Sequence, residues 1–370
     1  MKYIDMHCDT ISEIWYSDLR GERYSLRKNP LMIDLEKMRK GDCLCQNFGL
    51  FIDLHRPADF RGEEGEEERN KRRKAEETGS FMDPWKTVLQ LVRVFREETE
   101  RNSDLVGQVT SAAEIEANEK AGKMSALLTI EEGGACKGDI SHLQELYDAG
   151  ARMMTLTWNY PNELGKPNVP PKGFEEDFSR YFRFEPETEN GHPAEKNGLT
   201  KNGFAFAEAM QDMGMLVDVS HLSDAGFYDV AKTVKGPFVA SHSNCRALAG
   251  CNRNLTDDMI RTVAEHGGVI GLNFCPSFVT EAPVESQCRC SLEALAEHAR
   301  HMIKVGGSGV VGLGSDFDGI GREGLEMENC AQLPKLEEEL RRQHFTESEI
   351  EGIFHANVLR VYRDVLRSRP

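Results

Sequence analysis

Eight short apolar segments recur along the chain, and helix-like stretches separate them. We predict these segments to be β-strands, and they cover residues 2–9, 43–53, 125–132, 151–159, 215–221, 238–244, 268–275 and 310–317. Between them, residues 140–150, 257–268 and 291–307 carry apolar side chains at helical spacing. Strands that alternate with helices form a parallel sheet, and eight such units favour an α/β fold of the closed (β/α)8 TIM type. An open doubly wound sheet is the alternative, but no G-x-G-x-x-G follows the first segment.

The 370 residues are predicted to form one domain that spans residues 1–370. Two regions interrupt the alternation of strands and helices. Residues 55–83 are highly charged, with little apolar content, and are expected to be an exposed or partly disordered loop. Residues 160–198 are rich in Pro, Gly and Asn, and are expected to be a long loop over the top of the barrel. From Leu333 onward the pattern predicts two or three C-terminal helices.

Charge and cysteine usage restrict the partners and the compartment. The formal net charge of −17 argues against nucleic acid and against an anionic membrane surface as partners. No signal peptide and no apolar run long enough to span a bilayer is visible. The ten cysteines are scattered without zinc-ribbon spacing, which is typical of free thiols in a reducing compartment, so a cytoplasmic location is expected.

Metal-ligand residue types stand at the ends of several predicted strands. Histidines end the first, fifth and sixth segments, and carboxylates end the first, third and eighth: His7 and Asp9, Glu131 and Glu132, His221, His242, and Asp316 with Asp318. Barrel enzymes build their active sites from this end of the strands. Because histidine and carboxylate occur here without a thiolate, the set suits Zn, Mn or Fe(II).

The number of candidate ligands points to more than one metal ion. A catalytic zinc uses three protein ligands and keeps one position open. The five residues His7, Asp9, Glu132, His221 and His242 therefore exceed what one ion needs. They suit two ions that share a carboxylate, and two ions about 3.5–4 Å apart can hold a hydroxide between them.

The order of the strand-end motifs resembles that of the membrane (renal) dipeptidase family. The motifs are H-x-D, E-G-G, L-T-W-N, D-V-S-H, S-H-S, N-R-N and G-S-D-F-D-G, and they run along essentially the whole chain. The resemblance implies a (β/α)8 barrel with a binuclear zinc site that cleaves dipeptides, often with a D-residue at the C-terminal position. The chain looks like a soluble bacterial-type member, and because members of the family are often dimers, a homodimer is expected.

The resemblance also implies ligands for each ion. His7 and Asp9 are similar to the ligands of the first zinc, and His221 and His242 to those of the second. Glu132, immediately before the glycine pair, is similar to the bridging carboxylate, and strand alternation is expected to turn Glu131 away.

Substrate and proton-transfer roles come from the same resemblance. Arg253 is similar to the arginine that binds the free carboxylate of the substrate, which a guanidinium can grip with two hydrogen bonds. Asp316 matches the acid that orients the water and carries the proton to the leaving amine. The family often has a histidine where this chain has Trp158, so we expect Trp158 to form a pocket wall and Asn159 to supply a hydrogen bond instead.

The sequence, with this resemblance, thus predicts a metal-dependent dipeptidase that uses a metal-bridged hydroxide and two divalent ions, with Zn²⁺ as the expected metal. One alternative is another amidohydrolase-type enzyme, such as an N-acyl amino acid deacylase, although such enzymes commonly carry H-x-H on the first strand, where this chain has His7-Cys8-Asp9. A non-catalytic binding protein on a decayed barrel is a further alternative, but no ligand type is missing.

Overall fold

The computed structural model describes residues 1–62, 65–169, 177–182, 188–189, 192–193 and 198–367. Its main sheet contains β1 (Tyr3–Asp5), β2 (Cys43–Phe51), β3 (Val106–Val109), β4 (Met124–Glu131), β5 (Ala151–Thr155), β8 (Leu216–Asp218), β9 (Val239–Ala240), β10 (Val269–Leu272) and β11 (Val311–Leu313). A separate hairpin joins β6 (Thr188–Glu189) and β7 (His192–Pro193). Each of the eight predicted strand segments overlaps one strand of the main sheet.

Eight parallel strands close into a barrel. Hydrogen-bonded neighbours run in the order β2-β1-β11-β10-β9-β8-β5-β4, and β4 pairs in turn with β2, which closes the ring. The predicted (β/α)8 barrel is therefore confirmed, and the open doubly wound sheet is excluded.

Strand β3 is an addition that the sequence analysis did not predict. It pairs with β4 at Met124 to Leu127, on the edge of β4 that β5 takes at Leu128 to Glu131. Strand β4 therefore has a different neighbour along each half of this edge, while β2 pairs with it along the other edge.

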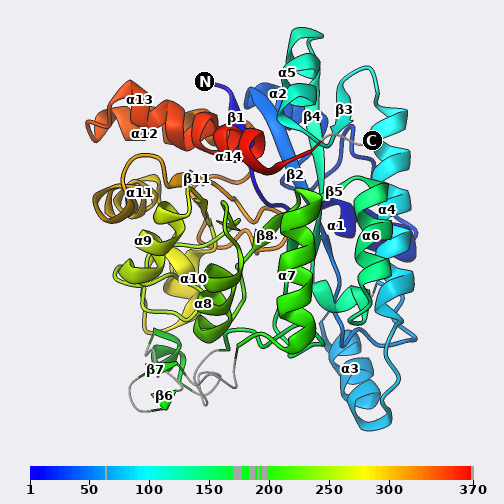
Figure 1. The fold of residues 1–370 in the computed structure, drawn as a ribbon. Coiled ribbons are helices and arrows are strands. Elements are labelled where there is room, and N and C mark those ends of the chain that lie inside the picture. Colours follow the sequence, from blue (N-terminus) through cyan, green and yellow to red (C-terminus); the bar gives the residue numbers. More distant parts are fainter. Residues whose placement is uncertain (63–64, 170–176, 183–187, 190–191, 194–197, 368–370) are drawn as a thin grey trace.

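The helices surround this ring (Figure 1). They are α1 (Thr10–Arg20), α2 (Leu35–Lys40), α3 (Glu66–Thr78), α4 (Pro84–Arg101), α5 (Ala112–Lys120), α6 (Ile140–Ala149), α7 (Lys201–Met213), α8 (Asp224–Thr233), α9 (Asp257–Glu265), α10 (Pro276–Val279), α11 (Leu292–Gly306), α12 (Leu333–Arg342), α13 (Glu347–Glu351) and α14 (Asn357–Val365). Single turns occur at η1 (Gly133–Cys136), η2 (Phe178–Phe182), η4 (Glu285–Gln287), η5 (Cys330–Gln332) and η6 (Gly352–Ala356). The three helices predicted between strands correspond to α6, α9 and α11, and the predicted C-terminal helices to α12, α13 and α14.

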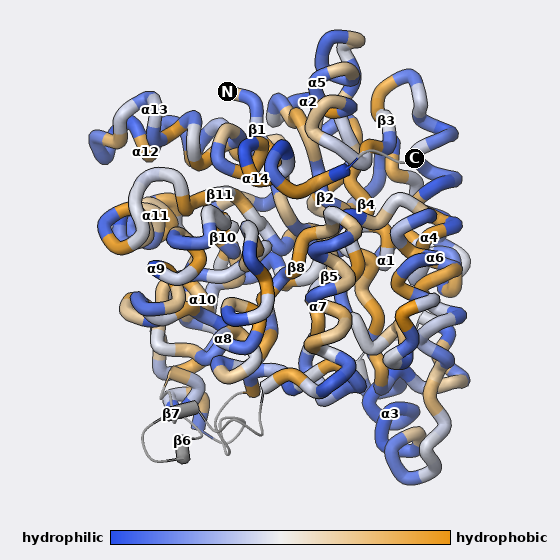
Figure 2. Tube along the Cα trace, viewed as in Figure 1, coloured by the Kyte–Doolittle hydropathy of each residue, from blue (hydrophilic) through white to orange (hydrophobic). Residues whose placement is uncertain are grey.

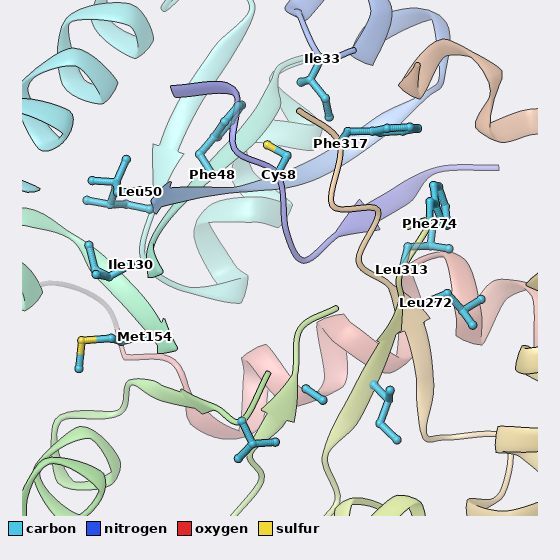
Figure 3. Close-up of a cluster of buried hydrophobic side chains, with 14 of the residues drawn as sticks. Cys8, Ile33, Phe48, Leu50, Ile130, Met154, Leu272, Phe274, Leu313 and Phe317 are labelled. Carbon is cyan, nitrogen blue, oxygen red and sulfur yellow. The ribbon is translucent and has the colours of Figure 1, made fainter. Parts of the chain in front are cut away.

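Most of the core lies between the barrel and its helices. Successive residues of a strand point to opposite faces, so alternate residues of β2, β4 and β5 face outward. Leu50, Ile130 and Met154 are register partners on these three adjacent strands and belong to this outer layer, where Figure 3 shows them in a row.

Helix α14 closes the amino-terminal end of the barrel. Its buried residues Val358, Val361 and Tyr362 pack with a cluster of inward-facing strand residues that includes Leu127 and Val269. The Tyr362 hydroxyl donates to Asn47 Oδ1 at 2.8 Å, which ties the helix to β2. Figure 1 shows α14 across one end of the barrel and α3 with the β6–β7 hairpin at the other end. The carboxyl ends of the strands therefore remain for a site.

The charged stretch at 55–83 is not simply a loop, because residues 66–78 form α3. Figure 2 shows α3 as hydrophilic over almost its whole length, and only Ala75 in it is buried. Glutamates in its first turn complement the positive end of the helix dipole. Arg72 anchors the helix by donating to Asp53 Oδ2 at 2.7 Å and to the Tyr160 hydroxyl at 3.1 Å. Low apolar content was therefore a misleading sign of disorder here.

The predicted long loop at 160–198 lies partly outside the described residues, so only its described pieces can be placed. These pieces include residues 160–169 and η2, which bring Asn168 and Tyr181 to a pocket at the carboxyl ends of the strands. Within the described part of the chain, no helix combines the length and apolar character that crossing a bilayer requires.

Candidate metal centre and active site

His7 and Asp9 lie just beyond the end of β1, where the chain turns into α1. Residue Asp9 occupies the position before the first turn of α1, and Cys8 between the two pairs with Phe317 in an isolated parallel bridge. The side chains of His7 and Asp9 meet as predicted, with His7 Nε2 3.5 Å from Asp9 Oδ2, and both are buried.

The glutamate that faces the histidines is Glu131, so the predicted orientation of this pair is wrong. Glu131 Oε2 lies 3.3 Å from His7 Nε2, and Glu131 Oε1 lies 3.2 Å from His221 Nε2. The reason is the alternation of side chains along β4. Leu128 and Ile130 face the covering helices, and Leu127 faces the inside of the barrel. Every second residue from Leu127 therefore faces inward, and Glu131 is the last of these in the strand.

Glu132 instead stabilises the turn that follows β4. Its carboxylate accepts hydrogen bonds from the Gly134 N–H at 2.6 Å, from the Trp158 N–H at 2.9 Å and from the amide of Asn162. Its backbone lies at φ 103°, a conformation that side chains other than glycine rarely adopt. The carboxylate therefore organises the loops after β4 and β5 and does not face the histidine cluster.

His221 and His242 complete the cluster from β8 and β9. Their Nε2 atoms lie 3.1 Å apart, and His242 Nε2 lies 3.7 Å from Glu131 Oε1. The ring of His242 stacks on that of His7 with centroids 3.9 Å apart. The structure thus brings His7, Asp9, His221 and His242 together, as the sequence predicted, around Glu131.

The cluster has the spacing and the unsatisfied atoms that a metal site requires. A cation with ligand distances of about 2.0–2.1 Å holds neighbouring tetrahedral ligands about 3.3 Å apart, close to the distances between Glu131 and its histidines. Within the described residues, His7 Nε2 and Asp9 Oδ1 are buried without a hydrogen-bond partner. Two groups, His7–Glu131–His242 and His7–Asp9–Asp316, have potential ligand atoms within 4.8 Å of one another. The residues present therefore fit a metal site.

Asp316 lies on the same rim after β11. Its Oδ1 is 3.9 Å from His7 Nε2, and its Oδ2 accepts a hydrogen bond from Asn273 Nδ2 at 2.9 Å. Asn273, at the end of β10, thereby holds the carboxylate toward the cluster. Asp318 faces away from it and accepts hydrogen bonds from Thr10 Oγ1 and the Met32 N–H, each at 2.6 Å.

Arg253 lines a pocket beside the cluster. The pocket, about 100 Å³, is lined by Asn159, Asn168, Tyr181, His221, Asn252, Arg253 and Phe278. The buried guanidinium donates to Ser243 Oγ and to the His242 carbonyl, each at 3.1 Å, and lies over the Phe278 ring. These contacts fix its position next to His221, while its Nε has no partner in the described structure.

Trp158 and Asn159 also lie beside His221. The Trp158 ring makes an edge contact with Phe51, with centroids 4.7 Å apart, and lies 6.3 Å from the His221 ring. Asn159 Oδ1 is 3.0 Å from His221 Nδ1. The oxygen of Asn159 is thus directed at the histidine, a contact that the sequence did not predict.

Burial shifts the proton affinities of the cluster. It raises the pKa of Asp316 to about 6 and, together with the charge of Arg253, lowers the pKa of His221 to about 4. Burial also lowers the pKa of His242. It would raise the pKa of Glu131, but His7 and His221 hold that pKa well below its usual range. Neutral His221 and His242 and ionised Glu131 are in the forms that bind metal, whereas, despite burial, Glu131 and Asp9 raise the pKa of His7.

Left-handed backbone marks the same region. The described residues include eight non-glycine residues with positive φ, and Glu132, His221, Asp316 and Asp318 are four of them. Such strain persists where the surrounding structure imposes it, often at functional sites. No sequence pattern indicated these conformations, and none indicated the role of Asn273 in holding Asp316.

Relatives of known sequence or structure match from three quarters to nearly all of the chain. A protein in the pqqA 5′ region of Klebsiella pneumoniae is 30% identical over 76% of this chain and 97% of its own length. An uncharacterised dipeptidase of Schizosaccharomyces pombe is 29% identical over 89% of this chain and 71% of its own. The structure of a Rhodobacter sphaeroides metallopeptidase, solved with a phosphinate mimic of L-Ala-D-Ala, superimposes with a TM-score of 0.74 at 22% identity over 99% of both chains.

The family model described as membrane dipeptidase, peptidase family M19, matches residues 1–369. This match covers every strand of the barrel and each residue of the cluster. The chain therefore belongs to the membrane dipeptidase family, and it is a metal-dependent dipeptidase on a (β/α)8 barrel.

Proposed function

We propose that the cluster holds two divalent ions, both zinc, and that it hydrolyses dipeptides. The observation that carries the proposal is the position of Glu131 between two sets of ligand atoms. Its Oε2 faces His7, which adjoins Asp9, and its Oε1 faces His221 and His242. One carboxylate with its two oxygens directed to different sides suits a bridge between two ions. The all-nitrogen-and-oxygen donor set suits zinc.

In this proposal His7 and Asp9 would hold the first ion, His221 and His242 would hold the second, and Glu131 would contribute to both. Divalent ions in such a site lower the pKa of a bound water and polarise the peptide carbonyl. Glu132, which the sequence suggested as the bridge, keeps only its role in the turn after β4.

Asp316 is the group that we assign to proton transfer. It lies on the rim of the cluster, and Asn273 fixes one of its oxygens. Burial raises its pKa to about 6, so the carboxyl can take up a proton near neutral pH and release it again. We infer that it accepts a proton from the attacking water and passes it to the amine that leaves.

Arg253 orients the substrate. A dipeptide carries a free carboxylate one residue from the scissile bond, and the guanidinium lies in the pocket beside His221. Charge-assisted hydrogen bonds to this carboxylate would place the peptide carbonyl over the cluster. We propose that D-residues are accepted at the C-terminal position, an idea supported by the L-Ala-D-Ala mimic bound to the Rhodobacter sphaeroides enzyme.

Trp158 is proposed to form a wall of the substrate site, since its ring packs on Phe51 and its centroid lies 6.3 Å from that of His221. The predicted hydrogen bond from Asn159 to the substrate stays a prediction. Its oxygen faces His221, so only its amide nitrogen could serve a substrate.

A panel of dipeptides tests the function directly. Metal-depleted protein is reconstituted with Zn²⁺, Mn²⁺ or Co²⁺, and hydrolysis is followed with L-L and L-D dipeptides, their C-terminal amides and N-acyl amino acids. We expect activity on free dipeptides that saturates at two ions per chain. Saturation at one ion, or faster hydrolysis of N-acyl amino acids than of every dipeptide, would refute the proposal.

A cytoplasmic location and a homodimer complete the proposal. None of the ten cysteines, all within the described residues, is paired in a disulfide, which suits a reducing compartment. The homodimer is supported by the family resemblance alone. Cell fractionation and sedimentation equilibrium test the two statements.

A further inference from the structure

A buried carboxylate that has no part in the proposed chemistry lies behind His242. Asp218, the last residue of β8, is fully buried. Its Oδ1 accepts from the backbone N–H groups of Ser220 at 3.0 Å and Ser241 at 2.9 Å. Its Oδ2 accepts from Thr155 Oγ1 at 2.7 Å and from Ser241 Oγ at 2.5 Å. The described chain gives it no ion-pair partner, so four hydrogen bonds alone stabilise the buried charge.

The direction of these hydrogen bonds settles what Ser241 can do. An ionised carboxylate only accepts, so Ser241 Oγ must give its single proton to Asp218. Ser241 Oγ also lies 2.7 Å from His242 Nδ1 and can only accept from it. His242 must then carry its proton on Nδ1, which leaves the lone pair of Nε2 directed toward Glu131 and His221.

Ser220 agrees with this arrangement. Its Oγ accepts from the His242 backbone N–H at 3.2 Å and lies 3.3 Å from Ser241 Oγ, to whose remaining lone pair it can donate. Every hydroxyl proton then has an acceptor.

We propose that Asp218, acting through Ser241 Oγ, is a positioning residue that fixes His242 in the Nδ1–H tautomer and thereby makes Nε2 a metal ligand. The inference rests on the proposed function, because it assumes that His242 binds an ion. His221 is set in the same way by a different group, since Asn159 Oδ1 accepts from its Nδ1 at 3.0 Å.

The distance between the two histidines shows what these tautomers require. With both protons on Nδ1, two bare Nε2 atoms face each other at 3.1 Å. Two lone pairs at this distance repel each other unless cations lie beside them, so the tautomers prepare the pair for metal. Partners of this kind typically change metal affinity by about 10–100-fold when they are removed.

The variant Asp218→Asn reverses the direction of the hydrogen bond between residue 218 and Ser241. Two backbone N–H groups bond the Oδ1 position, so the amide oxygen must stay there and the amide nitrogen must take the Oδ2 position. That nitrogen donates to Ser241 Oγ, whose own proton is released from the carboxylate and can turn to His242 Nδ1 or to Ser220 Oγ at 3.3 Å. Where it turns to Nδ1, the proton of His242 moves to Nε2 and blocks the ligand position.

The experiment compares Asp218→Asn and Ser241→Ala with a control, Thr155→Val, which also removes a buried hydrogen bond to Asp218 but leaves the path to His242 intact. Zinc affinity is measured by competition with a chromogenic chelator. The tautomer of His242 is measured by ¹⁵N NMR of the metal-free protein, with the resonance assigned by its loss in His242→Gln. Melting temperatures show that each variant is folded.

We expect both test variants to bind the second ion about 10–100-fold more weakly than Thr155→Val does. The Asp218→Asn protein should also show the Nε2–H form of His242. Affinities equal to that of Thr155→Val, or an unchanged tautomer in Asp218→Asn, would overturn the inference. Failure of the proposed function looks different, because the wild type itself would then bind fewer than two ions or His242→Gln would keep both.

Discussion

Arg253→Ala, tested with a matched pair of substrates, examines the proposed carboxylate contact most directly. Arg253 is 6% exposed and is held by Ser243 Oγ and the His242 carbonyl, so no large rearrangement is needed when it binds a carboxylate. A hydrogen bond to a charged group contributes about 1.5–3 kcal/mol. At about 1.36 kcal/mol per factor of ten, the contact corresponds to about 10–200-fold in kcat/KM.

The structure shows why the single variant alone is not sufficient. Truncation removes the donors to Ser243 Oγ and to the His242 carbonyl, although that carbonyl keeps a hydrogen bond from Asn273 Nδ2 at 3.2 Å. Any movement of His242 would slow every substrate alike. The ratio of kcat/KM for a dipeptide and for its C-terminal amide removes this common factor, because only the free acid gains from the guanidinium charge.

The assay measures kcat/KM for L-Ala-Gly and for its amide, with wild-type and Arg253→Ala proteins that carry equal metal. The wild type should prefer the free acid, and the variant should lose about 10–200-fold of that preference. Equal acid-to-amide ratios in the two proteins would refute the assignment of Arg253 as the carboxylate anchor.

Three further predictions concern the two glutamates, Asn159 and His298. Glu131→Gln should weaken metal binding by more than about 100-fold, because 100-fold is the upper end for residues that only support a metal ligand. Glu132→Gln should keep the metal and lower the stability by about 1–3 kcal/mol, because it weakens buried hydrogen bonds. Metal content and melting temperature distinguish the two variants, and the reverse result would restore Glu132 as the bridge. Asn159→Ala should lower zinc affinity by about 10–100-fold, because the side chain of Asn159 orients His221. If the zinc affinity is unchanged and kcat falls by ~10²-fold, Asn159 instead donates a hydrogen bond to the substrate. Burial lowers the pKa of His298 to about 4, so the unfolded state binds more protons as the pH falls below about 6.5. His298 alone should therefore account for about 2 kcal/mol of the stability that metal-free protein loses between pH 7 and pH 5. His298→Gln should lose about that much less than the wild type, and an equal fall in both proteins would contradict this reasoning.

The architecture and the composition of the site could be predicted from local patterns. Eight apolar segments that alternate with amphipathic ones require a parallel sheet with covered faces, and the barrel follows from their number. Four polar residues, His7, Asp9, His221 and His242, stood at the ends of these apolar segments. Folding alone does not require metal-ligand residue types at these positions, so they indicated a site. Parallel strands bring their carboxyl ends to one rim, so these residues had to meet.

The choice between Glu131 and Glu132 needed the tertiary structure. Both faces of a barrel strand are buried, so the run Ser125 to Ile130 is apolar enough on both sides that the sequence does not show which residues point inward. Only the packing of Leu127 inside the barrel and of Ile130 under the helices decides it.

The same limit applies to α3 and to the hydrogen bonds behind His242. Helix α3 has almost no apolar face, and Arg72 holds it through partners 19 and 88 residues away in the chain. Asp218 and Ser241 meet because β8 and β9 are neighbours in the ring, a contact that neither strand's own pattern encodes. The sequence by itself determined the strand order along the chain and the ligand types at the rim. Only the tertiary structure decided which side chains face each other, because that depends on strand neighbours and on inward or outward orientation, which are properties of the closed barrel.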